Sequence, residues 1–243
     1  MATTPHATPS RDPADDGTLL GMLREVLRKQ LQATDDMLPA QIVSYDRATN
    51  RAQVQPLIRL VTTDNRQLAR APVASVPVMQ FGGGGFVLSF NLQPGNLGWI
   101  KASDRDISLF LQTYGMQAPN SARLHSFSDA VFIPDVMTGY TLAGEDADNA
   151  VLQTLDGSVK VALGADQVKL AAGAASFTLS ATQAVLDVSG AGFTTSAAGT
   201  VFAGPVTMPA GATISGVPFG THKHAVAGIQ TGAGTVTSGG PTP

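Results

Sequence analysis

Two histidines near the C-terminus, His222 and His224, are the residues whose type and spacing could bind a metal. On an extended strand the two imidazoles project to one side and Lys223 projects to the other. The chain has only four histidines, and two of them are here. A lone His-x-His is a weak metal signal, and two solvent-exposed polar residues are the alternative. One pair supplies too few ligands for a closed site, so the preceding elements would have to bring several pairs together.

Catalytic chemistry has little support elsewhere in the sequence. The chain has no cysteine, which excludes disulfides, thiolate metal sites and cysteine nucleophiles. Glu145, Asp146 and Asp148 lie close together in a segment, 137–149, that has the composition of a linker. A glycosidase needs a positioned pair of carboxylates in a pocket, so we interpret these three as solvated linker charges. We expect no enzymatic activity.

An apolar pattern with a period of nine residues runs through 150–206. Residues two apart lie on the same face of a strand, so two parallel series of apolar residues predict one strand per repeat with two side chains on one face. A short fixed period is typical of stacked repeats. The first series is Leu152, Val161, Leu170, Leu179, Val188, Ala197 and Val206; the second is Ala150, Val159, Val168, Phe177, Leu186, Thr195 and Gly204, which weakens at its last two members.

Nine residues per repeat are too few for one chain to enclose a core, because single-chain solenoid coils use about 20 residues or more. Three chains that each give one strand per layer would form a triangular prism with six inward side chains per level. The sequence therefore predicts an intertwined trimeric β-helix, or β-prism, needle over 150–215. A β-meander within one chain, with a coincidental period, is the alternative.

A threefold axis would also change the meaning of the histidine pair. Two imidazoles from each of three chains give six ligands at an apex formed by 216–243. Zinc prefers four ligands in a tetrahedron, whereas six imidazoles fit an octahedral iron or nickel ion better. His222 and His224 are therefore the predicted metal ligands.

The first half of the chain has the pattern of a small barrel preceded by a helix. Leucines at spacings of three and four predict an amphipathic helix at 18–32, within an N-terminal arm that spans 1–37. Its apolar stripe needs a partner, which is its own body, sister chains or another protein. Short alternating strands over 38–136, with one short helix inside 104–114, predict an OB-fold barrel. The run 82–85 of four glycines lacks the Lys and Ser/Thr of a phosphate loop and predicts a hairpin loop.

Charge and hydropathy limit the possible partners. The net charge is -3, and residues 150–243 hold only three acidic and three basic side chains. A protein that binds nucleic-acid phosphates needs a basic surface, so we expect no nucleic-acid partner. No run of 18 apolar residues predicts a membrane-spanning helix, and the N-terminal segment has no apolar region typical of a secretory signal.

Taken in order, these parts resemble the central spike proteins of contractile phage tails, the baseplate assembly protein V or membrane-piercing spike family. The resemblance covers about 38–243, whereas 1–37 has no counterpart that we can match. It implies a homotrimer that docks on the tail hub or tube at the baseplate, is assembled in the host cytoplasm, and holds one iron ion through His222 and His224 of three chains. The similar stretches are LPAQIVSYD (38–46), VPV (76–78), PGN (94–96), SDAVFIP (128–134) and THKH (221–224).

The predicted function is that of a structural spike in the virion, which pierces the host outer membrane when the tail sheath contracts. A trimeric tail fibre or spike with carbohydrate-binding or depolymerase activity is the alternative. Such proteins need aromatic platforms and carboxylate pairs along the shaft. Residues 150–220 contain four phenylalanines and no Trp, Tyr or Glu, which favours the mechanical role.

Overall fold

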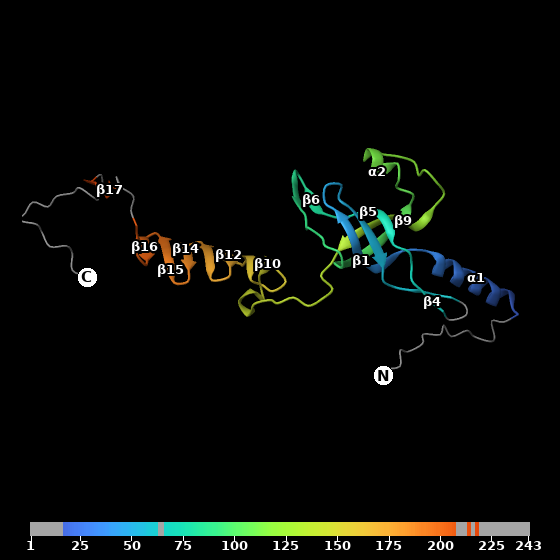
Figure 1. Cartoon of the computed structure of the whole chain (residues 1–243), viewed down its shortest axis with the longest axis horizontal. Coiled ribbons are helices and arrows are strands. Elements are labelled where there is room, and N and C mark those ends of the chain that lie inside the picture. The colour runs from blue at the N-terminus through green and yellow to red at the C-terminus, as the bar shows by residue number, and fades with distance from the viewer. Residues whose placement is uncertain (1–16, 63–65, 208–212, 215–216, 219–243) are drawn as a thin grey trace, which may run out of the picture. The chain divides into compact units, whose positions relative to one another are not determined.

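The computed structural model of the chain describes residues 17–62, 66–207, 213–214 and 217–218, and it is built mostly of strands (Figure 1). The chain divides into two units, 1–140 and 141–243. The predicted all-β class with one N-terminal helix is confirmed. The first unit contains α1 (Leu19–Ala33), β1 (Met37–Asp46), β2 (Arg51–Pro56), β3 (Leu60–Val61), β4 (Gln67–Leu68), β5 (Val73–Pro77), β6 (Phe81–Gly83), β7 (Phe86–Leu88), β8 (Leu97–Arg105), α2 (Phe110–Thr113) and β9 (Leu124–Pro134).

The second unit begins with a short 3-10 helix and continues as a series of strands. Its elements are η2 (Gly144–Asp146), β10 (Ala150–Gln153), β11 (Val159–Leu163), β12 (Gln167–Ala172), β13 (Ala175–Ser180), β14 (Gln183–Val188), β15 (Ala191–Ser196), β16 (Gly199–Ala203), β17 (Thr213–Ile214) and β18 (Val217–Pro218).

The first unit is a nearly closed five-stranded barrel with the strand order β5-β2-β1-β8-β9. Strand β1 has a partner on each side: Met37–Gln41 pairs with β8, and Ala40–Asp46 pairs with β2 across a bulge. A parallel bridge between Val78 and Phe132 closes the ring after β5, where the Met79 N–H donates to the Phe132 carbonyl at 2.8 Å. This arrangement confirms the predicted OB-like barrel.

Alternate residues of the barrel strands fill its core. Ile42, Val54, Ile100 and Phe132 are fully buried there. Gly98 in β8 permits the packing of the Phe132 ring, because a β-carbon at this position would lie 2.3 Å from the Ile133 carbonyl oxygen and 2.5 Å from the ring. The barrel therefore encloses its own apolar side chains within one chain.

Helix α1 occupies the predicted position, and hydrogen bonds and an ion pair just after its C-terminal end join it to the barrel. The hydroxyl of Thr18 accepts a hydrogen bond from the Gly21 N–H at 3.0 Å and caps the first turn. After the helix, the Asp35 N–H donates to the His125 carbonyl at 3.0 Å, and the Asp35 carboxylate pairs with Arg70 at 2.6 Å. The connection between helix and barrel is thus held by hydrogen bonds and an ion pair.

The glycine run 82–85 forms the tip of the β6–β7 hairpin, as its composition predicts. Gly84 and Gly85 have φ angles of +59° and +88°, which a two-residue turn of type I′ requires and which glycine adopts without strain. The predicted helix inside 104–114 is the single turn α2. The small β3–β4 hairpin is not predicted by the sequence pattern.

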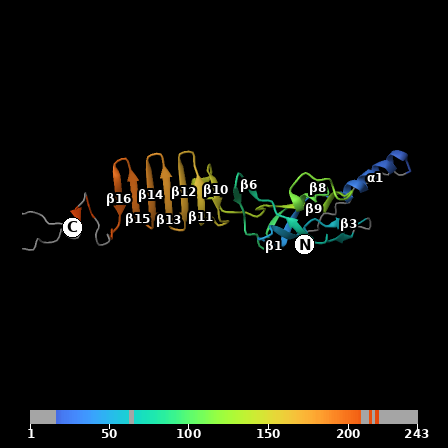
Figure 2. The ribbon, with the colours of Figure 1, turned by 90° about the horizontal axis from the view of Figure 1, so that it is seen from above.

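The second unit contains a seven-stranded antiparallel meander, β10 to β16, in which each strand pairs with the next one along the chain (Figure 2). Within one chain, the repeat region is therefore a meander. The association of three chains, which the sequence pattern also predicts, stays a prediction.

The predicted period of nine is wrong, because from β11 onward the strands start every eight residues, at 159, 167, 175, 183, 191 and 199. Neighbouring strands run in opposite directions. A residue on one strand and a residue on the next that face the same side of this sheet are therefore an odd number of positions apart in the sequence. Val161 pairs with Leu170 nine residues on, and Leu170 pairs with Phe177 seven residues on. A series of residues nine apart therefore stays on one face of the sheet, but from Val161 onward each member lies further from the start of its strand than the one before. The series reaches a turn at Ala197 and lies beyond the last strand of the meander at Val206.

Candidate interaction site: the apolar face of the meander

One face of the meander is almost entirely apolar, and we call it the apolar face. The strand register places alternate residues of all seven strands on it. Two threonines in the last two strands are its only polar members among the described strand residues. The apolar face consists of Ala150, Leu152, Val159, Val161, Leu163, Val168, Leu170, Ala172, Ala175, Phe177, Leu179, Ala184, Leu186, Val188, Ala191, Phe193, Thr195, Thr200 and Phe202.

The largest side chains of the apolar face form a central column that crosses every strand. Each member pairs directly with the next, and the rings of Phe193 and Phe202 lie 6.3 Å apart. On one side of this column lies a margin of smaller residues, namely Val159, Ala172, Ala175, Val188 and Ala191. The central column is Leu152, Val161, Leu170, Phe177, Leu186, Phe193 and Phe202.

The apolar face is not covered by the part of the chain that the structure describes. Seven of its large side chains are between 46% and 56% exposed, namely Leu152, Val159, Leu163, Leu170, Leu179, Val188 and Phe202. A contiguous apolar surface of this kind marks an interaction site in a soluble protein. The face is therefore suited to bind another apolar surface.

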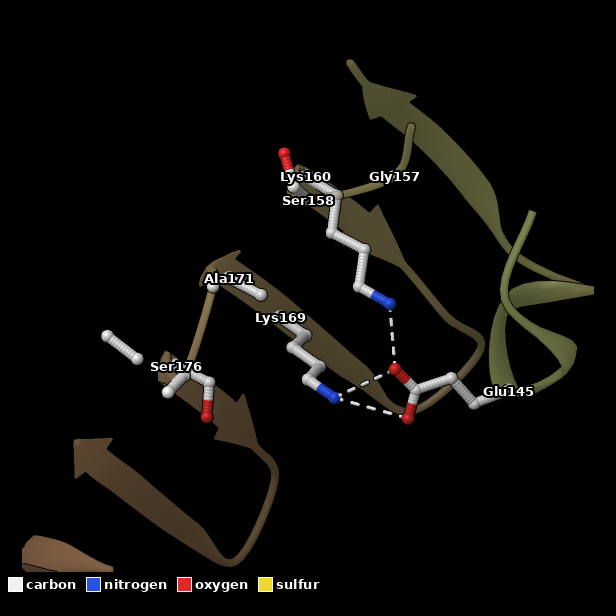
Figure 3. Close-up of a pocket in the computed structure, with 10 residues that line it drawn as sticks. Glu145, Gly157, Ser158, Lys160, Lys169, Ala171 and Ser176 are labelled. Carbon is white, nitrogen blue, oxygen red and sulfur yellow. Dashed lines mark hydrogen bonds and ion pairs between the residues drawn. The ribbon is translucent and has the colours of Figure 1, made fainter. Parts of the chain in front are cut away.

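The opposite face is mixed: it carries the lysines and most of the hydroxyl side chains of the strands together with valines and alanines, and η2 covers its first strands through a cluster of charges (Figure 3). The Lys160 ammonium donates to Glu145 at 2.7 Å and also to Asp146, and Lys169 donates to Glu145 at 3.0 Å. Asp146 is only 1% exposed and Lys160 only 8%. The interpretation of Glu145 and Asp146 as solvated linker charges is therefore wrong, because a folded sheet positions lysines beneath them; Asp148 remains exposed.

These contacts favour the charged form of every member whose titration shifts. The hydrogen bond from Lys160 is the main cause that lowers the pKa of Asp146, and the same lysine, followed by Lys169, lowers the pKa of Glu145. The hydrogen bond to Asp146, with that to Glu145, raises the pKa of Lys160. A cleft of about 280 Å³ adjoins the cluster. Since the ammonium groups are paired with carboxylates, the arrangement acts as a clamp between η2 and the sheet.

Two further apolar surfaces belong to the first unit. Helix α1 carries seven large apolar side chains that are 53% to 73% exposed: Leu19, Leu20, Met22, Leu23, Val26, Leu27 and Leu31. Of the three partners that the sequence left open, its own body is therefore excluded for the described residues. Phe81 and Phe86 are exposed on the β6–β7 hairpin. No helix among the described residues is both long and apolar enough to cross a membrane.

The predicted metal ligands His222 and His224 lie outside the described residues. The same holds for the predicted apex, 216–243, apart from Val217–Pro218. Metal binding at these histidines therefore stays a prediction.

The clamp generates a prediction about acid stability. The lowered pKa values of Asp146 and Glu145 mean that their stabilising effect is complete above the unfolded values, about 4, and is lost as the pH falls through the folded values. We expect Lys160→Met to lower the midpoint of thermal unfolding at pH 7, because Asp146 is left buried without its cation. The difference from the wild type should shrink at pH 3.

Circular dichroism at both pH values measures this difference. Lys169→Met is the matched control, because Lys169 is more exposed and pairs only with Glu145, so its effect should be smaller. Equal midpoints for the wild type and Lys160→Met at pH 7 would show that the clamp contributes nothing.

Comparison with known protein families finds a match over the barrel. Residues 38–135, about two fifths of the chain, match the family described as the phage protein Gp138 N-terminal domain. None of the curated proteins compared with the chain matches it. The match covers the OB-like barrel and does not extend to the meander. The chain is thus similar, through its barrel, to a phage protein domain, which supports a phage-related protein and a structural component of the virion.

Proposed function

We propose that this chain is a non-enzymatic homotrimeric spike at the tip of a contractile phage tail or a tail-like particle. In this proposal three meanders form the shaft, and contraction of the sheath drives the shaft through the outer membrane of the host. One observation carries the proposal: an apolar face extends over seven successive strands and has no cover among the residues of the chain that the structure describes. Three copies of the chain would supply that cover to one another.

The widths of the side chains favour three copies over two. In a triangular prism the space inside is widest opposite the middle of each face and narrows where two faces meet. The central column carries Leu and Phe, whereas the margin on one side, with Ala172, Ala175 and Ala191, is small. The column on the other side includes Leu163 and Leu179. Two sheets stacked face to face lie about 10 Å apart throughout, which would suit side chains of uniform size. The narrowing toward the margin of small residues therefore supports a wedge-shaped interior, as a threefold shaft would have on that side.

The opposite face supports the same orientation. It carries Lys169, Ser176, Thr178 and Asp187 among its residues, and η2 covers its first strands. A surface with charged and hydroxyl groups is stable in water. We therefore place this face outward in the shaft.

The first unit would attach the spike to the tail. The barrel encloses its own core, whereas α1 leaves its apolar side exposed at a defined junction with the barrel. An amphipathic helix of this kind can bind in an apolar groove of another protein. We assign the tail hub or tube as that protein.

The shaft can be tested by cross-linking, because the chain has no cysteine. Leu186 lies in the central column and would approach its counterparts near the threefold axis, whereas Val185 points to the opposite face. We expect Leu186→Cys to form disulfide-linked dimers under mild oxidation, because the thiols of two copies would face each other inside the shaft, where local movement of the strands can bring their Cα atoms to the roughly 4.4–6.8 Å that a disulfide needs. Val185→Cys, its neighbour with similar burial, should remain unlinked.

Non-reducing gel electrophoresis of the full-length variants measures the linked fraction. Equal cross-linking of the two variants, or none in either, would contradict a shaft built on the apolar face.

The metal at the apex belongs to the same proposal. Three pairs of imidazoles from His222 and His224 are a donor set that suits an octahedral iron ion, or another octahedral transition metal. When bound, the ion would fasten three chain ends. We expect about one metal ion per three chains in the purified protein, and its loss in the double variant His222→Ala/His224→Ala.

Elemental analysis by mass spectrometry measures this ratio. Lys223→Ala is the control, because Lys223 lies between the two histidines and its ammonium is not a ligand. Unchanged metal content in the double histidine variant would refute the assignment.

A further inference from the structure

Two threonines interrupt the apolar face at its C-terminal end. Thr195 in β15 and Thr200 in β16 stand directly opposite each other, and their hydroxyl oxygens lie 3.0 Å apart. The column that contains them is otherwise Ala150, Leu163, Val168, Leu179 and Ala184. A hydroxyl pair therefore occupies positions where the other strands have aliphatic residues.

The pair cannot satisfy its own hydrogen-bonding capacity. Each threonine hydroxyl has one donor and two acceptor sites, and a single hydrogen bond between them uses only one of the two donors. For these two hydroxyls, no second partner exists among the described residues. If the apolar face is covered, the remaining O–H must find an acceptor on the covering surface, because a buried unpaired donor is costly.

An apolar face with a regular repeat does not by itself fix how copies align. Strands of the same direction recur every 16 residues, so two copies that meet one hairpin out of step still place apolar residues against apolar residues. Such an encounter covers five of the seven strands. Register is weakly specified wherever neighbouring positions are chemically alike, and one polar pair inside an apolar seam can specify it.

We infer that Thr195 and Thr200 form the polar layer that sets the register between copies of this chain in the shaft. The inference rests on the proposed homotrimer. In the correct register, the threonine hydroxyls of neighbouring copies lie at the same level, and these hydroxyls are the side-chain acceptors that the apolar face offers among the described strand residues. In a slipped register it lies against aliphatic or aromatic side chains and stays unpaired. The layer thus rejects misaligned encounters during assembly.

The test compares two pairs of substitutions in the full-length Leu186→Cys chain after refolding from denaturant. Thr195→Val/Thr200→Val removes the hydroxyls of the layer and keeps the shape of the side chains. Thr178→Val/Thr194→Val is the matched control, because both of these threonines lie on the opposite face, where they pair with valines. A slip of one hairpin moves the cysteines about 10 Å apart, beyond the reach of a disulfide.

We expect the layer variant to keep the oligomeric mass of the parent chain but to lose about half of its disulfide-linked fraction after refolding, because slipped encounters that cover five of the seven strands no longer leave a hydroxyl donor unpaired and persist as trapped species. The control should keep the linked fraction of the parent. Equal linked fractions in the two variants would overturn the inference while leaving the homotrimer intact. A parent chain that is monomeric and unlinked would instead overturn the proposed function.

A second pair of substitutions covers the case in which the valine variant does not assemble. Thr195→Ser/Thr200→Ser keeps the hydroxyls and removes only the methyl groups. A parental linked fraction in the serine variant supports the hydroxyl layer. A loss as severe as that of the valine variant shows that methyl packing is what matters, and it overturns the inference.

Discussion

A β-sheet pairs the backbone groups of its inner strands but buries neither of its faces. In the meander, the hydrogen bonds that join each strand from β10 to β16 with the next are made within one chain, whereas the apolar side chains on one face are left uncovered by the described part of that chain. Antiparallel sheets in water ordinarily cover such a face and leave the polar one exposed. In the proposed shaft, further copies of the chain meet this constraint.

The two units meet the same requirement in different ways. The barrel curls its sheet until β5 and β9 meet, so that Ile42, Val54 and Phe132 are enclosed by one chain. The meander stays open, because its two end strands, β10 and β16, pair only with β11 and β15 among the described strands. Its stability should therefore depend on association, as it does whenever binding is linked to folding. A contractile tail offers a setting in which such a shaft is assembled before it is used.

Local sequence patterns are sufficient to predict the elements that form through interactions between residues close in the sequence. The leucine spacing predicts α1, the glycine run predicts the β6–β7 hairpin, and the alternation of apolar residues identifies the apolar face of the meander. The period of nine is wrong because neighbouring strands of the meander are antiparallel: from β11 onward the central column steps by nine and then by seven residues in turn. The clamp was missed because Asp146 and Lys160 are 14 residues apart and meet only once the sheet has formed. The sequence signal for this cluster is the pair Lys160 and Lys169, which are nine residues apart and lie on the face opposite the apolar face.

The central claim is that copies of this chain cover one another along the apolar face. Native mass spectrometry of the full-length protein tests it most directly, because it counts chains without any substitution. The account predicts a species of three times 25.0 kDa, 75 kDa, that persists on dilution. A folded species of 25.0 kDa at every concentration would contradict the account, since the apolar face would then be stable in water without a partner.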